Sequence, residues 1–452
     1  MSRSRDSRTT RTTVVLFTRD LRVHDHPALA CAAAADARVV PLFVLDDALL
    51  RSDYARPNRV QFLVESLADL DASLRSLGGR LVVRRGDPVR EVLAVARAAG
   101  AQAVFMSDDV SAFARHRARR LDEGCAAHGL ELRRFPGVTV LAPGIVRPAR
   151  GDHFRVFTPY WNRWRATPLR ACAPKPRRLV LSSAVAAGVL PARADLVPGV
   201  PSPDLMRGGE TCARARIAGW FGGGIARYAA RHDALAEEGT SRLSPYLHLG
   251  CASAVEVASR CAARKTREAF LRQLCWRDFH HQVTAAFPAI AHADYRPRRR
   301  RWRDDAALLE AWKAGRTGYP IVDAGMRQLA AQGWMHNRAR LLTASFLVRD
   351  LGIDWRLGAR HFLDLLVDGD IANNSGNWQW VAGTGNDTRP NRRFNPVRQA
   401  LRFDPEGTYV RRWLPELASV PGPRVHTPWA LEPAVRDRLA YCEPLVAPRG
   451  RA

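Results

Sequence analysis

The spacing of apolar residues changes abruptly along this chain, and the change limits the folds open to it. Between Thr13 and about Pro136, short β-branched runs alternate with helical stretches; the runs are VVLF, RVVPLFVL, RLVVRR, AQAVFM and LELRRF. This alternation predicts an α/β domain with a parallel, doubly wound, Rossmann-like sheet whose strand ends line a crevice. No G-x-G-x-x-G follows the first run, so a dinucleotide site is not predicted there.

From about Gly208 to Trp429 the strand signals nearly vanish and apolar residues recur at helical spacing, which predicts an all-α domain. Its clearest segments are REAFLRQLCWRDFHHQVTAAF, DAGMRQLAAQGWMHNRARLLTASFLVRDL and GARHFLDLLVDG. Between the two halves, from about Ala171 to Asp204, a stretch rich in Pro, Ala and Arg predicts a surface connector. The expected division is a disordered basic arm (1–12), the α/β domain (13–136), a connector (137–207), the helical domain (208–430) and a tail (431–452).

Composition indicates a polyanionic partner. The 452 residues include 70 basic and 44 acidic ones, a formal net charge of +26, and only Lys175, Lys265 and Lys313 are lysines. Arginine makes bidentate phosphate contacts and stacks on bases, so nucleic acid is favoured over a membrane surface. The scattered cysteines show no C-x-x-C and no paired Cys/His spacing, so we expect no metal site and a reducing cytoplasm. No apolar run reaches the roughly 20 residues that span a bilayer.

The stretch GTSRLSPYLHLG, residues 239–250, reads as the start of a helix. Ser244 suits the N-cap and Pro245 the first helical position. Hydroxyl groups, Arg242 and backbone N–H groups meet there, an arrangement that binds phosphate. An ordinary helix cap has the same local pattern, so both interpretations stay open.

The stretch DGDIANNSGNWQWVAGTG, residues 368–385, places two tryptophans among turn-forming residues. If it is helical, Trp378 and Trp380 diverge by about 200° and face different partners. Asp368 and Asp370 allow a metal pair, an acid–base pair or two turn residues, but no third hard ligand sits at a familiar spacing. Arg340 is a candidate counter-charge for one of these acids.

Other aromatic and histidine residues allow two interpretations. Trp302 lies in RPRRRRWRDD and Trp355 follows LGID, two contexts that do not demand core packing. Adjacent residues on a helix point about 100° apart, so His280 and His281 are expected to form a polar edge rather than share one ligand.

Taken together, GTSRLSPYL, QLCWRDF, GRTGYPIVDAGMRQL, GWMHNRARLLTASFLVRD, DGDIANN and NWQWVAGTG resemble the photolyase/cryptochrome family of flavoproteins, most of all its bacterial cyclobutane pyrimidine dimer photolyases. The similarity runs from VVLFTRDLRVHD to VHTPW at residues 425–429. It implies an N-terminal antenna domain, a helical domain that holds FAD, and UV-damaged DNA as the substrate. We expect a monomer.

The resemblance assigns a set of residues to FAD. Those implied to hold the nucleotide are Tyr228, Thr240, Ser241, Arg242, Leu243, Ser244, Phe270, Arg277 and Gly369. Around the flavin ring it implies an Arg340–Asp368 ion pair, a hydrogen bond between the ring and Asp370, and Asn374 facing N5. Repair enzymes resemble this chain in having Asn at that position, whereas plant cryptochromes have Asp and animal ones Cys. A neutral amide suits a reduced anionic flavin, because a carboxylate would add like charge.

The resemblance also gives the tryptophans two roles. Trp378, Trp355 and Trp302 are implied to relay electrons to FAD from the surface, whereas Trp276 and Trp380 are implied to sandwich the extruded dimer. Residues expected at the lesion or its flanking phosphates are Gln273, Asn337, Arg338, Leu341, Arg392 and Arg393. The implied repair is electron transfer from photoexcited reduced FAD to a dimer that has left the duplex.

Departures from the family pattern keep alternatives open. Gln273 replaces a common Glu and also occurs in (6-4) photolyases, although WMHNR resembles the dimer enzymes; Leu341 replaces a common Met. Ala114 stands where folate-binding relatives have a carboxylate, which favours 8-hydroxydeazaflavin over methenyltetrahydrofolate as a second chromophore; an empty or FMN-filled site stays open. A blue-light photoreceptor and a flavin-independent DNA-binding protein are the other classes. The short stretch after VHTPW leaves little room for a signalling tail, so we expect repair.

Overall fold

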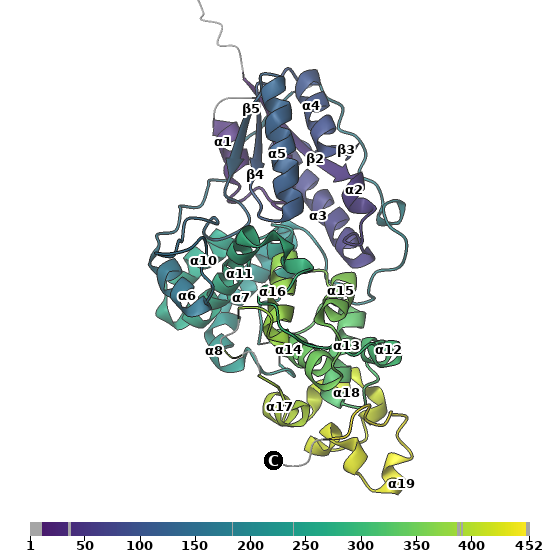
Figure 1. Ribbon diagram of the computed structural model, residues 1–452. Coiled ribbons are helices and arrows are strands. Elements are labelled where there is room, and N and C mark those ends of the chain that lie inside the picture. Colours follow the sequence, from purple (N-terminus) through teal and green to yellow (C-terminus); the bar gives the residue numbers. More distant parts are fainter. Residues whose placement is uncertain are drawn as a thin grey trace, which may run out of the picture.

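The computed structural model describes residues 11–34, 38–182, 184–237, 239–386, 389 and 392–448. Figure 1 shows the α/β domain at one end of the molecule and the helical domain at the other. The strands are β1 (Thr12–Phe17), β2 (Arg38–Asp46), β3 (Val82–Gly86), β4 (Ala103–Ser107), β5 (Glu131–Phe135) and β6 (Val180–Leu181). The five predicted strand runs are thus confirmed, and β6 was missed. Of the arm predicted for residues 1–12, only Arg11 and Thr12 are described, and Thr12 already belongs to β1.

The sheet is parallel throughout, with the order β3-β2-β1-β4-β5 and β6 paired to the start of β2. Its helices are α1 (Pro27–Ala34), α2 (Asp47–Leu50), α3 (Pro57–Ser76), α4 (Pro88–Ala98) and α5 (Ala112–Ala127). Val14 and Leu16 pack in one core with α4, while Val15 and Phe17 point to the other face and share a core with α1 and α3. Because helices cover both faces, the strands read as unbroken apolar runs.

The segment predicted as a connector, residues 137–207, contains a helix, α6 (Phe157–Ala166), one face of which is buried. Trp161 and Trp164 on this helix are buried, and Trp164 Nε1 donates a hydrogen bond of 3.0 Å to Asp278. Burial raises the pKa of Asp278 to about 6. The positive charge of Arg277 and the N–H groups that donate to this carboxylate lower the pKa and so oppose the effect of burial. The first part of this segment therefore belongs to the core, and only the later part is largely irregular.

The second half is helical, as predicted. Its helices are α7 (Glu210–Gly222), α8 (Tyr228–Arg231), α9 (Ser244–His248), α10 (Ala254–Ala262), α11 (Glu268–Ala286), α12 (Ala306–Lys313), α13 (Pro320–Gln332), α14 (Asn337–Ser345), α15 (Trp355–Leu365), α16 (Ile371–Ala382), α17 (Pro396–Phe403), α18 (Thr408–Trp413) and α19 (Pro433–Arg436). Within the described part of the chain, no helix is long and apolar enough to cross a membrane.

One predicted helical segment, DAGMRQLAAQGWMHNRARLLTASFLVRDL, is broken in two. Gly333 ends α13 in the left-handed region, with φ of 58°, and the Nδ1 atom of His336 accepts from the N–H of Arg338 at the start of α14. Glycine adopts this conformation without strain. The break turns Trp334 and Met335 toward the interior of the domain, where they line a cavity.

The stretch around Trp378 forms α16. The Asp370 side chain caps this helix by accepting from the N–H of Asn373 at 2.9 Å, and Gly383 ends it with φ of 78°. Its small residues permit close packing, because a Cβ at Gly376 would lie 2.1 Å from His280 on α11. The turn-forming residues therefore have three roles: Asp370 caps the helix, Gly383 ends it, and Gly376 lets it pack closely on α11.

Candidate functional site

A cavity of about 440 Å³ opens in the helical domain. This volume lies within the range of roughly 300–1,000 Å³ that is usual for ligand and cofactor sites. The predicted site residues that line it are Tyr228, Thr240, Ser241, Arg242, Leu243, Ser244, Phe270, Gln273, Trp276, Arg277, Asn337, Arg338, Arg340, Leu341, Asp368, Asp370 and Trp380. The fold therefore brings together residues that are spread over α8 to α16.

The stretch 240–244 forms one wall of this cavity. The helix begins at Ser244 and its N-cap is Leu243, so the prediction of Ser244 as the N-cap was wrong by one residue. The Leu243 N–H donates instead to Ser241 Oγ at 3.3 Å. Arg242 adopts φ of 49°, a conformation that non-glycine residues rarely take, and its guanidinium lies 4.7 Å from the centroid of Trp334. Such backbone conformations occur preferentially at ligand sites.

Tyr228 and Phe270 form an aromatic wall of the same cavity, with centroids 5.1 Å apart and planes at 86°. Arg277 also lines the cavity, but its guanidinium donates to two backbone carbonyls, those of Val138 at 2.6 Å and Leu247 at 3.2 Å. Arg277 thus ties the connector segment to the helical domain.

The predicted Arg340–Asp368 ion pair is present, with a distance of 2.8 Å. Arg340 also donates to the Met335 carbonyl at 2.8 Å, so its guanidinium is held from two sides. The Oδ1 atom of Asp368 is buried and has no hydrogen-bond partner among the described residues, and the same holds for Nδ1 of His280. Both residues line the cavity, and buried polar atoms without partners are uncommon. The wall therefore fits a large polar ligand that has its own donors and acceptors.

Asp370 joins the two domains. Its Oδ2 atom lies 2.5 Å from Arg19, which follows β1, and Arg19 in turn contacts Asp109 at 3.1 Å. Burial alone would raise the pKa of Asp370, but neighbouring positive groups, Arg19 among them, hold it well below its usual range. Sequence reasoning assigned no role to Arg19, because nothing local links it to a residue 351 positions later.

Three histidines are buried near this site. His248 and His281 lie within 4.0 Å of Asp370, and His280 lines the larger cavity. Burial lowers the pKa of His280 and His281 to about 4 and that of His248 well below its usual value. They are therefore neutral at pH 7, and Arg19 is the cation in direct contact with Asp370. In the part of the chain that the structure describes, no group of three or more His, Cys, Asp or Glu side chains is placed to hold a metal ion.

A smaller cavity of about 70 Å³ adjoins the first and is lined by Asn374 and Trp378. The Nδ2 atom of Asn374 donates to the Ala359 carbonyl at 3.0 Å, which fixes the orientation of the amide. The Trp378 ring is buried against α15, where a Cβ at Gly358 would lie 2.3 Å from it. Trp380, by contrast, is half-buried and lines the larger cavity with Trp276. The predicted divergence of these two tryptophans is confirmed.

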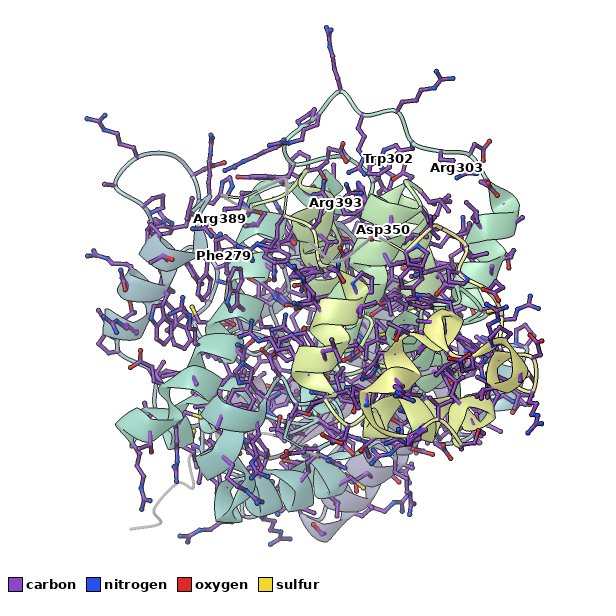
Figure 2. All side chains as sticks on the ribbon, turned by 90° about the horizontal axis from the view of Figure 1, so that it is seen from below. Phe279, Trp302, Arg303, Asp350, Arg389 and Arg393 are labelled. Atoms are coloured by element: carbon purple, nitrogen blue, oxygen red, sulfur yellow. The ribbon has the colours of Figure 1, made fainter. Side chains whose placement is uncertain are left out.

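The other two tryptophans of the predicted relay lie at the start of α15 (Trp355) and in the segment before α12 (Trp302). Trp355 is fully buried at the start of α15, one helical turn from Gly358, so the expectation that its position does not demand burial was wrong. Its Nε1 atom donates to Asp294 at 2.9 Å. Trp302 is half-buried, and the N–H of the next residue, Arg303, donates to the Gly352 carbonyl at 2.8 Å. Figure 2 shows Trp302 and Arg303 toward the upper edge of that view.

The arginines predicted to contact phosphate have partners within the chain. Arg338 pairs with Asp233 at 2.5 Å, a partner 105 residues away that sequence reasoning missed. Arg393 donates to the Arg349 carbonyl and lies 4.0 Å from Asp350, and Figure 2 shows Arg393 near Asp350. The guanidinium of Arg392 lies 5.0 Å from the Trp380 centroid.

A second cavity, of about 360 Å³, lies between the domains. Its wall includes Thr18 and Arg19 after β1, and Asp109 and Ser111 after β4. These two strands are neighbours at the point where the strand order reverses, the usual ligand position in such sheets. The predicted crevice is thus confirmed, and Ala114 lines it.

Comparison with known proteins gives consistent results. Residues 13–178 match the family model described as DNA photolyase, and residues 270–450 match that of the FAD binding domain of DNA photolyase. The chain is 54% identical to the deoxyribodipyrimidine photo-lyase of Streptomyces griseus over 96% of each chain.

Two solved structures share the fold. One is a bacterial class III photolyase from Agrobacterium tumefaciens, with a TM-score of 0.91, 32% identity, and coverage of 99% of this chain and 96% of that chain. The other is an archaeal photolyase from Sulfolobus tokodaii that contains two FAD molecules, with a TM-score of 0.84, 31% identity, and coverage of 97% and 96% respectively.

Proposed function

This chain belongs to the DNA photolyase family, and from that premise we propose that it is a deoxyribodipyrimidine photo-lyase that repairs cyclobutane pyrimidine dimers in DNA under light. The observation that carries the proposal is the larger cavity. Its lining includes the cradle Thr240–Ser244 and the Arg340–Asp368 pair, and also two half-buried tryptophans, Trp276 and Trp380. A cofactor and a flat substrate therefore fit the same cavity.

FAD, when bound and reduced, supplies the electron that splits the dimer after it absorbs light. The residues of this chain bind and orient it. Thr240, Ser241, Arg242, Leu243 and Ser244 would hold its phosphates, and Tyr228 and Phe270 would pack nearby. The Arg340–Asp368 pair, Asp370 and the preceding Gly369 would hold the flavin ring, and the neutral Asn374 amide would face N5.

Trp276 and Trp380 hold the dimer. Both rings line the cavity and keep part of their surface accessible. Photolyases are known to take their target out of the base stack, and a crosslinked dimer stacks poorly, which lowers the free energy of extrusion by comparison with an intact base pair. Gln273, Asn337 and Leu341 complete the walls around the lesion.

Trp378, Trp355 and Trp302 form the path by which an electron reaches FAD from the surface. Trp378 packs on Gly358, one helical turn from Trp355, and the Trp302 segment is hydrogen-bonded to Gly352 just before that helix. These packing contacts support the order that the family resemblance implies.

Arg338, Arg392 and Arg393 contact phosphates that flank the lesion. The guanidinium of Arg392 already lies over Trp380, which lines the cavity. Each phosphate contact that is lost reduces the slope of log affinity against log salt by about 0.7–0.9. The affinity of an Arg392→Gln variant, measured over a range of salt concentrations, tests this assignment.

The interdomain cavity holds the second chromophore, for which 8-hydroxydeazaflavin is favoured. The cavity lies at the switch point of the sheet, and Ala114 offers no carboxylate for a folate. Mass spectrometry of the pigments released from the purified protein distinguishes 8-hydroxydeazaflavin, FMN, a second FAD and a folate. Detection of a folate would overturn the assignment.

The reaction is tested with an oligonucleotide that carries one cyclobutane dimer. The FAD-loaded, reduced protein should restore the intact bases under blue light and leave the dimer unchanged in darkness. A parallel oligonucleotide with a (6-4) photoproduct should not be repaired. Equal dimer loss with and without light, or none in either, would refute the proposal, and the absence of loss in both would favour a photoreceptor or a simple DNA-binding role.

We also propose that the protein acts as a monomer in the cytoplasm. Light scattering coupled to size-exclusion chromatography tests the first part, with a mass near 50.2 kDa expected for the polypeptide. Fluorescence microscopy of a tagged chain in its own cells tests the second.

A further inference from the structure

Phe157 is stacked on Trp276, although it comes from the segment expected to be a connector. The ring centroids are 3.6 Å apart and the planes differ by 2°. Phe157 is the first residue of α6, whereas Trp276 lies on α11 and lines the larger cavity. Neither the sequence pattern nor the proposed function assigns Phe157 a role.

The stacking leaves one side of Trp276 covered. The edge of Phe279 meets Trp276 at 87° with centroids 5.6 Å apart, and His280 lies 5.7 Å away at 29°. Trp276 is nevertheless only half-buried, and Gln273 beside it is exposed. The indole therefore keeps an accessible part even though Phe157 covers one side, and it lines the larger cavity.

Phe157 is itself held firmly. It is 5% exposed, meets Phe279 edge-on at 5.7 Å, and has the Arg272 guanidinium 5.1 Å from its centroid. Just before α6, the Phe154 backbone exchanges two hydrogen bonds with the Gln282 amide, of 3.0 and 2.8 Å. Together with the hydrogen bond from Trp164 to Asp278, these contacts hold α6 and the residues before it against α11.

Figure 2 shows Phe279 well separated from Trp302. The aromatic cluster around Trp276 is therefore distinct from the outer end of the tryptophan path. A change in this cluster is expected to alter dimer binding without altering that path.

We propose that Phe157 is a positioning residue for lesion recognition, which fixes the plane of Trp276 so that an extruded dimer meets an indole already oriented for stacking. The inference rests on the proposed function. A side chain that is ordered before binding loses less freedom when the ligand arrives, so its ligand binds more tightly. Aromatic pairs contribute enough beyond burial to change an equilibrium by about threefold to tenfold.

The test compares dimer binding by variants of the FAD-loaded protein in darkness. Phe157→Ala removes the ring, Phe157→Leu keeps most of its volume without a planar face, and Phe157→Tyr keeps the planar face. Phe154→Ala is the matched control, because Phe154 lies in the same segment but packs edge-on against Tyr160, with centroids 5.6 Å apart. Fluorescence anisotropy gives the affinity for a dimer oligonucleotide and for its undamaged counterpart.

We expect Phe157→Ala and Phe157→Leu to bind the dimer oligonucleotide about threefold to tenfold more weakly, with unchanged affinity for undamaged DNA. Phe157→Tyr and Phe154→Ala should keep the preference of the unmodified protein. At saturating DNA, the yield of repair per absorbed photon should change little in any of them, because the change affects binding rather than electron transfer.

Two outcomes would overturn the inference. One is full dimer preference in Phe157→Leu, which is expected to fold because it conserves volume. The other is an equal loss in Phe154→Ala, which would mean that any gap under α6 has the same effect. If the unmodified protein itself shows no preference for the dimer, the proposed function fails instead.

Discussion

At the scale of single residues, Trp378 and Trp380 show how a helix directs two nearby side chains to different surroundings. Successive residues turn by about 100°, so positions two apart face different surroundings. Trp378 is 3% exposed and packs on α15, while Trp380 is half-buried at the larger cavity. That the two rings face different surroundings was predictable from their spacing alone, once the segment was taken as helical.

Replacing Trp378 by Phe should slow the photoreduction of oxidised FAD at least tenfold and leave dimer repair by chemically pre-reduced protein nearly unchanged. The reason is that the Phe ring is much harder to oxidise, whereas repair does not use the tryptophan path. Absorption after blue-light exposure measures the first quantity. Trp312→Phe is the control, because Trp312 also contacts Trp378, with centroids 6.1 Å apart, but lies off the proposed path. An equal effect of both variants would contradict the assignment.

Replacing Asn374 by Asp should make the flavin harder to reduce. The change adds negative charge in a buried position and places a carboxylate against the Ala359 carbonyl, which Asn374 now donates to at 3.0 Å. We expect the midpoint potential to fall by on the order of 30 mV, a tenfold effect for a two-electron couple. Asn377→Asp also adds a carboxylate at the cavities, but at an exposed position where solvent screens its charge, so it should shift the potential less. Equal shifts, or a rise, would contradict the placement of Asn374 at the ring.

Sequence reasoning succeeded at the residue scale where partners lie close in the chain or where a motif is shared. It missed Arg19 and Asp233, which pair with Asp370 and Arg338 across 351 and 105 positions. Such pairs depend on how domains and helices pack, which no local pattern encodes. The error at Ser244, which was predicted as the N-cap, was local. The helix begins one residue earlier than expected, and the hydroxyl that accepts a backbone N–H at this turn is that of Ser241, which binds the Leu243 N–H.

At the scale of elements, α15 packs closely on α16 around Trp378, the inner end of the proposed tryptophan path. Gly358 lies within α15, and a Cβ there would sit 2.3 Å from the Trp378 ring. Only glycine allows this approach, even though alanine is the better helix former.

Gly358→Ala should therefore lower the free energy of unfolding by about 1–3 kcal/mol, the usual cost of overpacking a core. Gly219→Ala in α7 is the matched control, because a Cβ there meets nothing within 4 Å. That change should stabilise the protein by up to about 1 kcal/mol through helix propensity. Urea unfolding measures both. A neutral or stabilising effect of Gly358→Ala would mean that Trp378 is loosely packed.

The elements themselves were predictable wherever the apolar period was regular. All five expected strand runs form the sheet, because continuous apolar runs are what a strand covered on both faces requires. The break at Gly333 and the helix α6 were not predicted. The first depends on a left-handed turn and a histidine cap, and the second on burial of Trp161 and Trp164 against a distant helix.

At the scale of the whole molecule, the two halves are joined by buried polar contacts as well as apolar packing. Arg19 binds Asp370 and the His248 carbonyl from across the interface. Asp25, which follows β1, accepts from Arg170 of the connector segment and from Ser253 at the start of α10. This interface places the interdomain cavity directly beside the cap of α16, since Asp370 lines both cavities.

Buried neutral histidines should make the fold sensitive to mild acid. Burial lowers the pKa of His280, His281, His336 and His361 to about 4, whereas the unfolded chain protonates them near 6.5. Between these values the unfolded state binds more protons, so stability falls as pH drops from about 6.5 to 4. Each group contributes on the order of 1 kcal/mol per pH unit.

Urea unfolding at several pH values measures this effect. His361→Gln should reduce the slope of stability against pH by roughly one proton, because it removes one of the four groups. Stability that is constant or rises between pH 6.5 and 4.5 would contradict the burial of these histidines as neutral side chains.

The central claim is that one cavity brings a reduced flavin and a flipped pyrimidine dimer into contact. The emission of the reduced flavin in the FAD-loaded protein tests it most directly, because electron transfer to a neighbouring dimer competes with emission. We predict that a dimer oligonucleotide quenches this emission, that an undamaged oligonucleotide does not, and that emission recovers as light splits the dimers. Emission that stays the same with both oligonucleotides would contradict the account.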